Sequence, residues 1–285
     1  MNGILLINKP QDYTSRDVVN KLGGILKTKK IGHTGTLDPI ATGVLVVCVG
    51  NTTKLCELLT SEYKEYIATI KLGIKTDTLD TTGKIIEEKK FNISENLIKE
   101  VLNSFLGEST QTTPIYSAVK VNGKKLYEYA REGIEVELPT RDINITNIEL
   151  ISFNNDEIKF KTTVSKGTYI RALIDDICKK LNTVGTMSSL IRTKQGKFTI
   201  ENSYTIEDIQ NGNYQITTIE DALSDIECIN INEELYNKVK NGSIIEKKFN
   251  NDIACLKYNN KIIAIYKEYD KDYSKAKPFK MFIND

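Results

Sequence analysis

The sequence predicts an α+β protein with a mixed, mostly antiparallel sheet, followed by a second, small β-rich domain. Segments with the patterns of strands outnumber amphipathic helices. Strands and helices do not alternate in the regular βαβ order that indicates a parallel sheet. From about residue 228, short strands recur between Asn, Gly and Lys turns. We therefore expect one domain over residues 1–227 and a second over 228–285, the latter near the lower size at which domains fold unaided.

The N-terminal elements follow from simple patterns. The apolar run 44–50 is continuous, which is typical of a buried strand, whereas 64–73 alternates at period two. In order we expect strand 4–8, ended by Lys9-Pro10, a helix capped by Thr14 or Ser15 and stopped at Gly23-Gly24, strand 44–50, one or two helical turns in 52–59, strand 64–73 and a polar loop at 76–83.

Caps and turns also order the rest of the chain. Ser94 is a typical helix cap, and Asn122-Gly123 is a typical hairpin turn. The expected elements are helix 95–107, strand 115–123, helix 125–132, strands near 134–138, 142–153 and 157–165, helix 169–181, strand 190–200 and C-terminal strands 254–258, 261–269 and 278–283.

Composition restricts the class of protein. Five scattered cysteines form no CxxC pair and there is one His, so we expect neither disulfides nor a metal site. No apolar run reaches the roughly 18 residues of a membrane helix, and the N-terminus lacks the features of a signal peptide, which indicates a cytoplasmic protein. Net charge is +1, from 39 basic and 38 acidic residues. Nucleic-acid binding would therefore depend on local clusters such as Lys120, Lys124, Lys125 and Arg131.

The run HTGTLDPIATG, residues 33–43, is the strongest candidate for a site. An Asp in such a turn usually makes a structural Asx-turn. Here Pro39 biases Asp38 towards an extended backbone, and flanking glycines allow the main chain to approach a ligand closely. No phosphate-loop or dinucleotide motif is present, and the only His lies on the same loop, which disfavours a serine triad. Glycoside chemistry with Asp77 or Asp80 as the second carboxylate remains open.

Five segments in order resemble the TruB family, the synthases that make pseudouridine 55 in tRNA. They are GILLINKPQDYTSRDVV, GHTGTLDPIATGVLVVCVG, KEYIATIKLGIKTDTLDTTG, QTTPIYSAVKVNGKKLYEYAR and SKGTYIRALIDDI. The resemblance covers the chain to about residue 200. The tail, ending KPFKMFIND, more weakly resembles a PUA-like RNA-binding domain.

The resemblance implies a reaction and a role for Asp38. These enzymes detach uracil from ribose at N1, rotate it and rejoin it through C5, without a cofactor. Asp38 corresponds to the nucleophile, and attack at ribose C1′ and at uracil C6 are both open. A carboxylate suits the step because it is ionised at neutral pH and can form a covalent intermediate and then leave.

Two further residues correspond to catalytic positions of the family. Arg171 matches the arginine that pairs with the Asp, where a guanidinium would hold and aim the carboxylate. Tyr66 matches a tyrosine that stacks against the target base. Because a free phenol is a poor base at neutral pH, stacking is the role we expect.

The remaining correspondences concern the base pocket and its support. His33, Tyr169 and Leu190 match residues near the flipped base. Lys9 and Pro10 are expected to support the active loop, and Asp80 is expected to hold its own Thr-rich turn.

The implied partner is the T-stem-loop of tRNA. The target uridine must be flipped out of the folded loop at a cost of a few kcal/mol, which stacking and phosphate contacts would offset. Segment 124–150, with Lys124, Lys125, Arg131 and Arg141, is the candidate RNA clamp. We expect a monomer that needs no protein partner. The alternatives are a guide-RNA-dependent rRNA pseudouridine synthase, a catalytically silent RNA-binding or RNA-folding module, and a nucleoside glycosidase.

Overall fold

The computed structural model describes residues 1–60 and 63–282. Within them, a nine-stranded sheet has the order β1-β3-β12-β4-β11-β10-β7, with β2 paired to β3 and β13 to β12. Its strands are β1 (Gly3–Lys9), β2 (Ile31–His33), β3 (Thr42–Val49), β4 (Tyr63–Leu72), β7 (Gly107–Thr112), β10 (Thr140–Asn154), β11 (Glu157–Ser165), β12 (Gly185–Gln195) and β13 (Phe198–Thr199).

A second, five-stranded sheet has the order β14-β16-β17-β18-β15 among the described residues. It comprises β14 (Cys228–Asn230), β15 (Ile245–Glu246), β16 (Ile253–Tyr258), β17 (Lys261–Glu268) and β18 (Lys275–Met281). Two small hairpins pair β5 (Ile74–Thr76) with β6 (Ile85–Glu88), and β8 (Lys120–Val121) with β9 (Lys124–Lys125). Of the ladders between these strands, β12–β3 and β14–β16 are parallel and the others antiparallel, which confirms the predicted α+β class with a mixed sheet.

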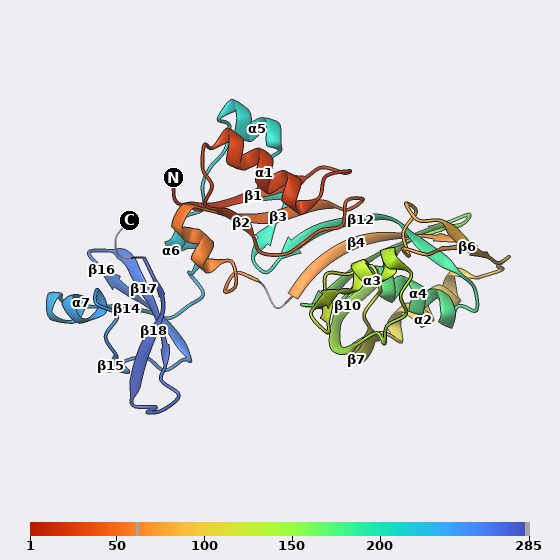
Figure 1. Ribbon diagram of the computed structural model, residues 1–285. Helices are drawn as coiled ribbons and strands as arrows, with labels where there is room; N and C mark the ends of the chain where they lie inside the picture. The colour runs from red at the N-terminus through yellow and green to blue at the C-terminus, as the bar shows by residue number, and fades with distance from the viewer. Residues whose placement is uncertain (61–62, 283–285) are drawn as a thin grey trace.

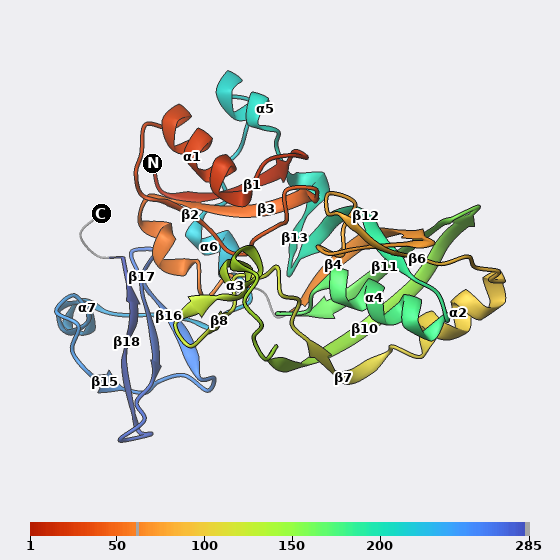
Figure 2. The same ribbon diagram turned by 45° about the vertical axis from the view of Figure 1, so that its right-hand side comes forward.

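The helices of the described residues are α1 (Ser15–Ile25), η1 (Gly50–Leu55), α2 (Glu95–Asn103), α3 (Leu126–Glu132), α4 (Ile170–Lys180), η2 (Ile200–Asn202), α5 (Ile206–Asn211), α6 (Ile219–Ala222) and α7 (Glu233–Val239). Helices α1 and α5 lie beside β1 and β3, α2 and α4 lie beside the other half of the large sheet, and α7 lies beside the C-terminal sheet (Figures 1 and 2). No helix of the described residues is long and apolar enough to cross a membrane.

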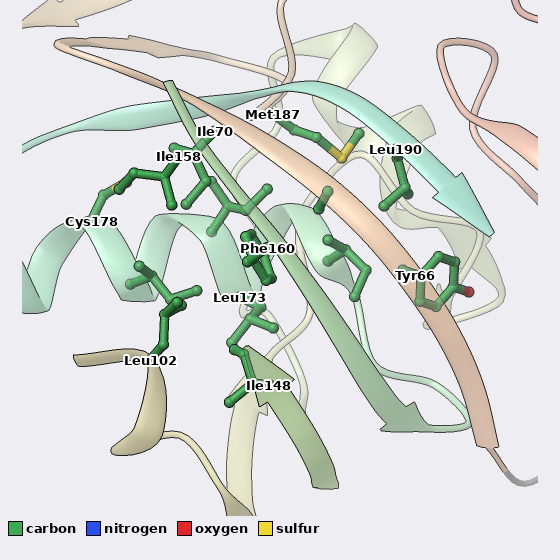
Figure 3. Packing of buried hydrophobic residues seen from close by; sticks show 14 of the residues in the cluster. Tyr66, Ile70, Leu102, Ile148, Ile158, Phe160, Leu173, Cys178, Met187 and Leu190 are labelled. Carbon is green, nitrogen blue, oxygen red and sulfur yellow. The ribbon is translucent and has the colours of Figure 1, made fainter. Parts of the chain in front are cut away.

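Three of the four apolar clusters among the described residues involve the large sheet, and the fourth lies within the C-terminal domain. In β4, alternate residues Tyr66, Ala68 and Ile70 are buried in the same cluster as Leu173 and Ile177 of α4. Figure 3 shows Tyr66, Ile70 and Leu173 within this cluster. Strands β1 and β3 are buried on both faces. One face packs against α1 and α5, and the other packs against the C-terminal sheet in a single shared cluster. The C-terminal sheet is therefore attached to the large sheet through an apolar core (Figure 1).

Local signals located many boundaries within one or two residues. Thr14 caps α1 through a reciprocal bond with Asp17, and Ser94 caps α2. Asn122 and Gly123 both have positive φ, as the predicted hairpin turn requires. Helix α1 passes through Gly23-Gly24 and ends at Ile25, and α2 ends at Asn103, because Gly107 already begins β7. The 52–59 segment is a 3₁₀ helix placed slightly earlier.

Some predicted strands were wrong. Residues 115–118 bend instead of forming a strand, because this backbone turns into the pocket described below, and only Lys120–Val121 of that segment is a strand. The 134–138 segment is irregular and mostly exposed before Pro139. The strand expected at 190–200 is β12, which begins at Gly185 and stops at Gln195. In the last predicted strand, residue 283 lies outside the described residues. Sequence patterns missed the short strands β2, β5, β6, β7, β14 and β15 and the helices α5, α6 and α7.

Candidate active site

The loop between β2 and β3 carries Asp38 and is fixed at several points. Buried Ser15, the first residue of α1, exchanges hydrogen bonds with Leu37: its Oγ accepts from Leu37 N (2.8 Å) and donates to Leu37 O (3.3 Å). Ala41 N donates to Asp38 O (3.0 Å), which closes a turn over Pro39. The loop is therefore rigid on both sides of the carboxylate, as a preorganised site requires.

Lys9 supports the same loop from beneath. Its side chain is fully buried at the end of β1, and its ammonium donates to the carbonyls of Pro10 (2.8 Å), Tyr13 and Pro39 (3.2 Å). Burial lowers the pKa of Lys9 to about 8, against opposing attraction from Asp12 and Asp38. Lys9 thus connects the carbonyls of Pro10 and Tyr13, after β1, with that of Pro39 in the Asp38 loop.

Arg171 and Asp38 form a bidentate ion pair. Arg171 Nε donates to Asp38 Oδ2 (2.9 Å) and NH2 donates to Oδ1 (3.2 Å). The Arg171 side chain is 6% exposed, whereas that of Asp38 is 33% exposed. The same guanidinium donates to Thr78 O and Tyr116 O, both at 3.0 Å. Since the arginine has four acceptors around it, it holds the carboxylate in one orientation while leaving it accessible.

The carboxylate lies in a cavity of about 520 Å³ between the Asp38 loop, β4, α4 and the segment before α3. Among the described residues that line this cavity, Asp38 supplies the single carboxylate. Tyr66 and Leu190 contribute apolar walls and are 7% and 6% exposed. They lie at one end of the packed cluster in Figure 3, with the Tyr66 hydroxyl directed away from the other labelled side chains. The space is large enough for a flat base beside the carboxylate.

Tyr169 also lines the cavity and is fixed through its backbone. Gln111 Oε1 accepts from Tyr169 N (2.8 Å), and Gln111 Nε2 donates to Tyr169 O (3.1 Å). Arg141 lies 5.3 Å from the Tyr169 ring centroid. Gln111 is buried on β7, so this bridge connects the start of α4 to the far edge of the sheet.

His33 and Asp80 lie near the cavity without lining it. His33 ends β2, immediately before the lining residue Thr34. Burial, with smaller effects of Arg192 and Arg16, lowers the pKa of His33, so the imidazole is neutral at pH 7. Asp80 accepts from Thr82 N (3.0 Å) and from the hydroxyls of Thr78 and Thr82, all within its own turn. That turn presents the Thr78 carbonyl to Arg171.

Comparisons of the sequence with known proteins point to one family. A profile of the TruB family pseudouridylate synthase N-terminal domain matches residues 24–170, and one of the tRNA pseudouridylate synthase B C-terminal domain matches 171–227. The chain belongs to the TruB family. It is 47% identical over 272 residues to tRNA pseudouridine synthase B of Clostridium tetani, covering 94% of this chain and 93% of that protein. The protein of the same name from Bacillus pumilus is 42% identical, with 100% and 99% coverage.

Solved structures confirm the fold of the TruB chain. A structure described as an H/ACA RNP bound to a substrate RNA containing 2'-deoxyuridine has a TM-score of 0.74, with 22% identity and coverage of 99% of this chain and 85% of the other. A Cbf5-Nop10-Gar1 complex gives a TM-score of 0.73 at 24% identity, with 99% and 84% coverage. At this identity the likeness concerns the fold alone.

The predicted RNA-binding cations of this TruB protein lie around α3 and the β8–β9 hairpin. Lys124 pairs with Glu132 and lies 4.9 Å from the Tyr129 ring centroid, and Lys120 is exposed. Lys125 and Arg131 both lie close to Tyr127, at 5.3 and 5.4 Å from its ring centroid. Because Tyr127 also lines the cavity, this basic cluster is continuous with the Asp38 site.

Sequence reasoning missed three buried polar residues that shape the TruB site. They are Gln111, Lys64 and Arg192, of which Lys64 and Arg192 line the cavity. Lys64 lies two residues before Tyr66 in a strand whose side chains alternate between the two faces. The sequence could therefore have predicted that Lys64 lies on the same buried face as Tyr66. Arg192 and Gln111 gave no such signal, because each lies far along the chain from Asp38.

Proposed function

We propose that this TruB protein converts uridine 55 in the T-loop of tRNA to pseudouridine, with Asp38 as the nucleophile. The observation that carries the proposal is Asp38, the single carboxylate among the described residues that line the cavity. Arg171 binds both of its oxygens, and its side chain is 33% exposed. The names of the relatives from Clostridium tetani and Bacillus pumilus support tRNA as the substrate.

In this proposal each wall of the cavity has one task. Tyr66 stacks on the flipped uracil, Leu190 and Tyr169 limit its position, and Arg171 keeps Asp38 aimed at the reacting carbon. His33, adjacent to the wall, would fill the space that the flipped base leaves in the RNA. Pseudouridine formation is an isomerisation, so the residues present suffice without a redox cofactor.

A glycosidase is disfavoured by the same geometry. That chemistry requires a second carboxylate close to Asp38. Asp80 is committed to the threonines of its own turn, and Asp77 Oδ1 accepts from Lys84 N (2.8 Å). Neither residue is among those that line the cavity.

The RNA would be held by two regions. Residues 124–150 form the proposed clamp within a catalytic domain of residues 1–227, and residues 228–285 form the proposed PUA-like domain. The C-terminal sheet shares a core with β1 and β3, so its contribution to binding is better tested by substituting surface charges than by deletion. We propose that the enzyme acts as a cytoplasmic monomer without a protein partner.

The test is to incubate the purified protein alone with an unmodified tRNA transcript and map pseudouridine by carbodiimide labelling and primer extension. A transcript with cytidine at the T-loop position is the matched control. One stop at the T-loop uridine, absent in the control, is the expected result. Activity that requires an added guide RNA, or release of free uracil, would contradict the proposal.

A further inference from the structure

The cavity around Asp38 is strongly cationic. Its charged lining residues, within the described part of the chain, are one carboxylate, Asp38, and four cations: Lys64, Lys166, Arg171 and Arg192. Arg171 binds both Asp38 oxygens. The other three cations differ in depth. Lys166 is exposed at the rim, whereas Lys64 and Arg192 are buried.

Arg192 is a permanent buried charge beneath the Asp38 loop. It lies on β12, and its side chain is fully buried. Its Nε donates to Val44 O (2.8 Å) and its NH2 to Gly35 O (3.0 Å), while NH1 is buried with no hydrogen-bond partner. Since a guanidinium stays protonated in proteins, this positive charge cannot be removed by proton loss. The two carbonyl dipoles partly solvate the Arg192 charge. Among the described residues, Arg192 forms no salt bridge with a carboxylate.

Lys64 lies beside Arg192 on the floor of the cavity. It shares the buried face of β4 with Tyr66 and is 9% exposed. A Cβ placed on Gly35 would lie 3.6 Å from Lys64 Cε and 3.4 Å from Arg192 NH1, so both side chains converge under the loop that carries Asp38. Burial, with repulsion from Arg192 and Lys166, lowers the pKa of Lys64 to about 8. The ammonium is thus mostly charged at neutral pH, but held at an energetic cost.

We propose that Lys64, with Arg192 behind it as a positioning residue, binds the negative charge that the uracil ring acquires during the reaction. This inference rests on the proposed function. If Asp38 attacks C1′, the electron pair of the C1′–N1 bond leaves with the ring as a uracil anion. If Asp38 adds to C6, the C5–C6 π pair moves onto the ring carbonyl at C4. On either route the C1′–N1 bond breaks with its electron pair on N1, and the ring is anionic before C1′ joins C5. On the first route C5 displaces the Asp38 carboxylate from C1′, and on the second the Asp38 carboxylate leaves C6 as C5 loses its proton. The product forms once C5 has lost a proton and N1 has gained one.

The position of the two cations favours the ring over a phosphate group. They are buried on the floor beside the Tyr66 ring and the Leu190 side chain, whereas the exposed Lys166 suits the RNA backbone. A neutral uracil gains little from a cation in this floor, and an anionic ring gains much. Interactions that strengthen only as charge develops accelerate the reaction instead of tightening substrate binding.

The test compares Lys64→Met, which removes the charge, with Lys64→Arg, which retains it. Single-turnover pseudouridine formation and tRNA affinity are measured separately. We expect Lys64→Met to slow the step by roughly 10²–10³-fold, the typical loss for one charge-stabilising donor, with tRNA affinity within threefold. Lys64→Arg should lie within about tenfold of wild type.

A pH profile gives an independent readout, and it remains decisive if Lys64→Met does not fold. The wild-type rate should fall as pH rises through about 8, where Lys64 loses its proton, and this fall should be absent in Lys64→Arg. The other charged and titratable groups that line the cavity are Asp38, Tyr66, Tyr116, Tyr127, Lys166, Tyr169, Arg171 and Arg192. Lys9, also with a pKa of about 8, lies behind the loop.

Three outcomes would overturn the inference. The first is a Lys64→Met enzyme with a normal rate. The second is one with weakened tRNA affinity but a normal rate once bound, which would indicate a phosphate contact. The third is a basic limb that persists in Lys64→Arg, which would assign the titration to Lys9 or another group. Failure of the proposed function would look different, because the wild-type protein itself would form no pseudouridine.

Discussion

Replacing Arg171 by lysine tests the geometry of the ion pair while preserving its charge. The guanidinium makes two bonds to Asp38 and one each to Thr78 O and Tyr116 O. A lysine ammonium is a point charge and cannot reach all four acceptors. Each buried acceptor left unmatched costs about 1–3 kcal/mol. Because Asp38 is a third exposed and water can solvate it, we take the low end for that residue.

The expected loss is therefore about 3–4 kcal/mol, which corresponds to roughly 10²–10³-fold in kcat/KM if all of it falls on the transition state. The assay is pseudouridine formation at saturating and limiting tRNA, with thermal unfolding measured in parallel. Arg16→Lys, at an exposed position of α1, is the matched control and should be neutral. Turnover of Arg171→Lys within threefold of wild type would refute the argument that the paired geometry matters.

Three further substitutions probe the support of the site. Gly43 has φ +103°, and a Cβ there would lie 2.2 Å from Arg192 O, so Gly43→Ala should lower the free energy of unfolding by more than about 3 kcal/mol. The control is Gly24→Ala, which has open space in helix α1 and should be neutral or stabilising. Chemical denaturation measures both variants, and equal effects would contradict the strain argument. Lys9→Met removes the hydrogen bonds to three carbonyls, so it should lower Tm by about 5 °C and kcat roughly tenfold. An unchanged Tm would show that the Asp38 loop is stable without Lys9. Gln111→Ala should cost about 2 kcal/mol of stability, because it leaves Tyr169 N and O without their amide partner, and an unaltered denaturation midpoint would exclude the bridge.

Elements with strong local patterns could be predicted from the sequence. The Thr14 cap, the alternation of β4 and the apolar run of β3 each depend on neighbours in the chain. The strand predicted at 115–118 was wrong for a physical reason. The apolar alternation of this segment is that of a strand, but the Tyr116 carbonyl accepts a hydrogen bond from Arg171 instead of from a neighbouring strand.

The site was predictable only where the family resemblance supplied long-range information. Asp38 and Arg171 are 133 residues apart, and no local pattern brings them together. The same holds for Arg192, whose partners Val44 O and Gly35 O lie about 150 residues earlier. A buried arginine interrupts the apolar pattern of β12 without indicating which carbonyls will satisfy it. Such residues become visible only once the strands are assembled.

The most direct test of the central claim is release of the hydrogen at uracil C5. Joining C1′ to C5 expels this hydrogen, so tRNA transcribed with [5-³H]uridine releases tritium to water in proportion to isomerisation. We predict about one tritium released per tRNA with the wild-type protein and none above background with Asp38→Asn, which should still bind tRNA with similar affinity. Release by Asp38→Asn at a rate near that of wild type would contradict the assignment of Asp38 as the nucleophile.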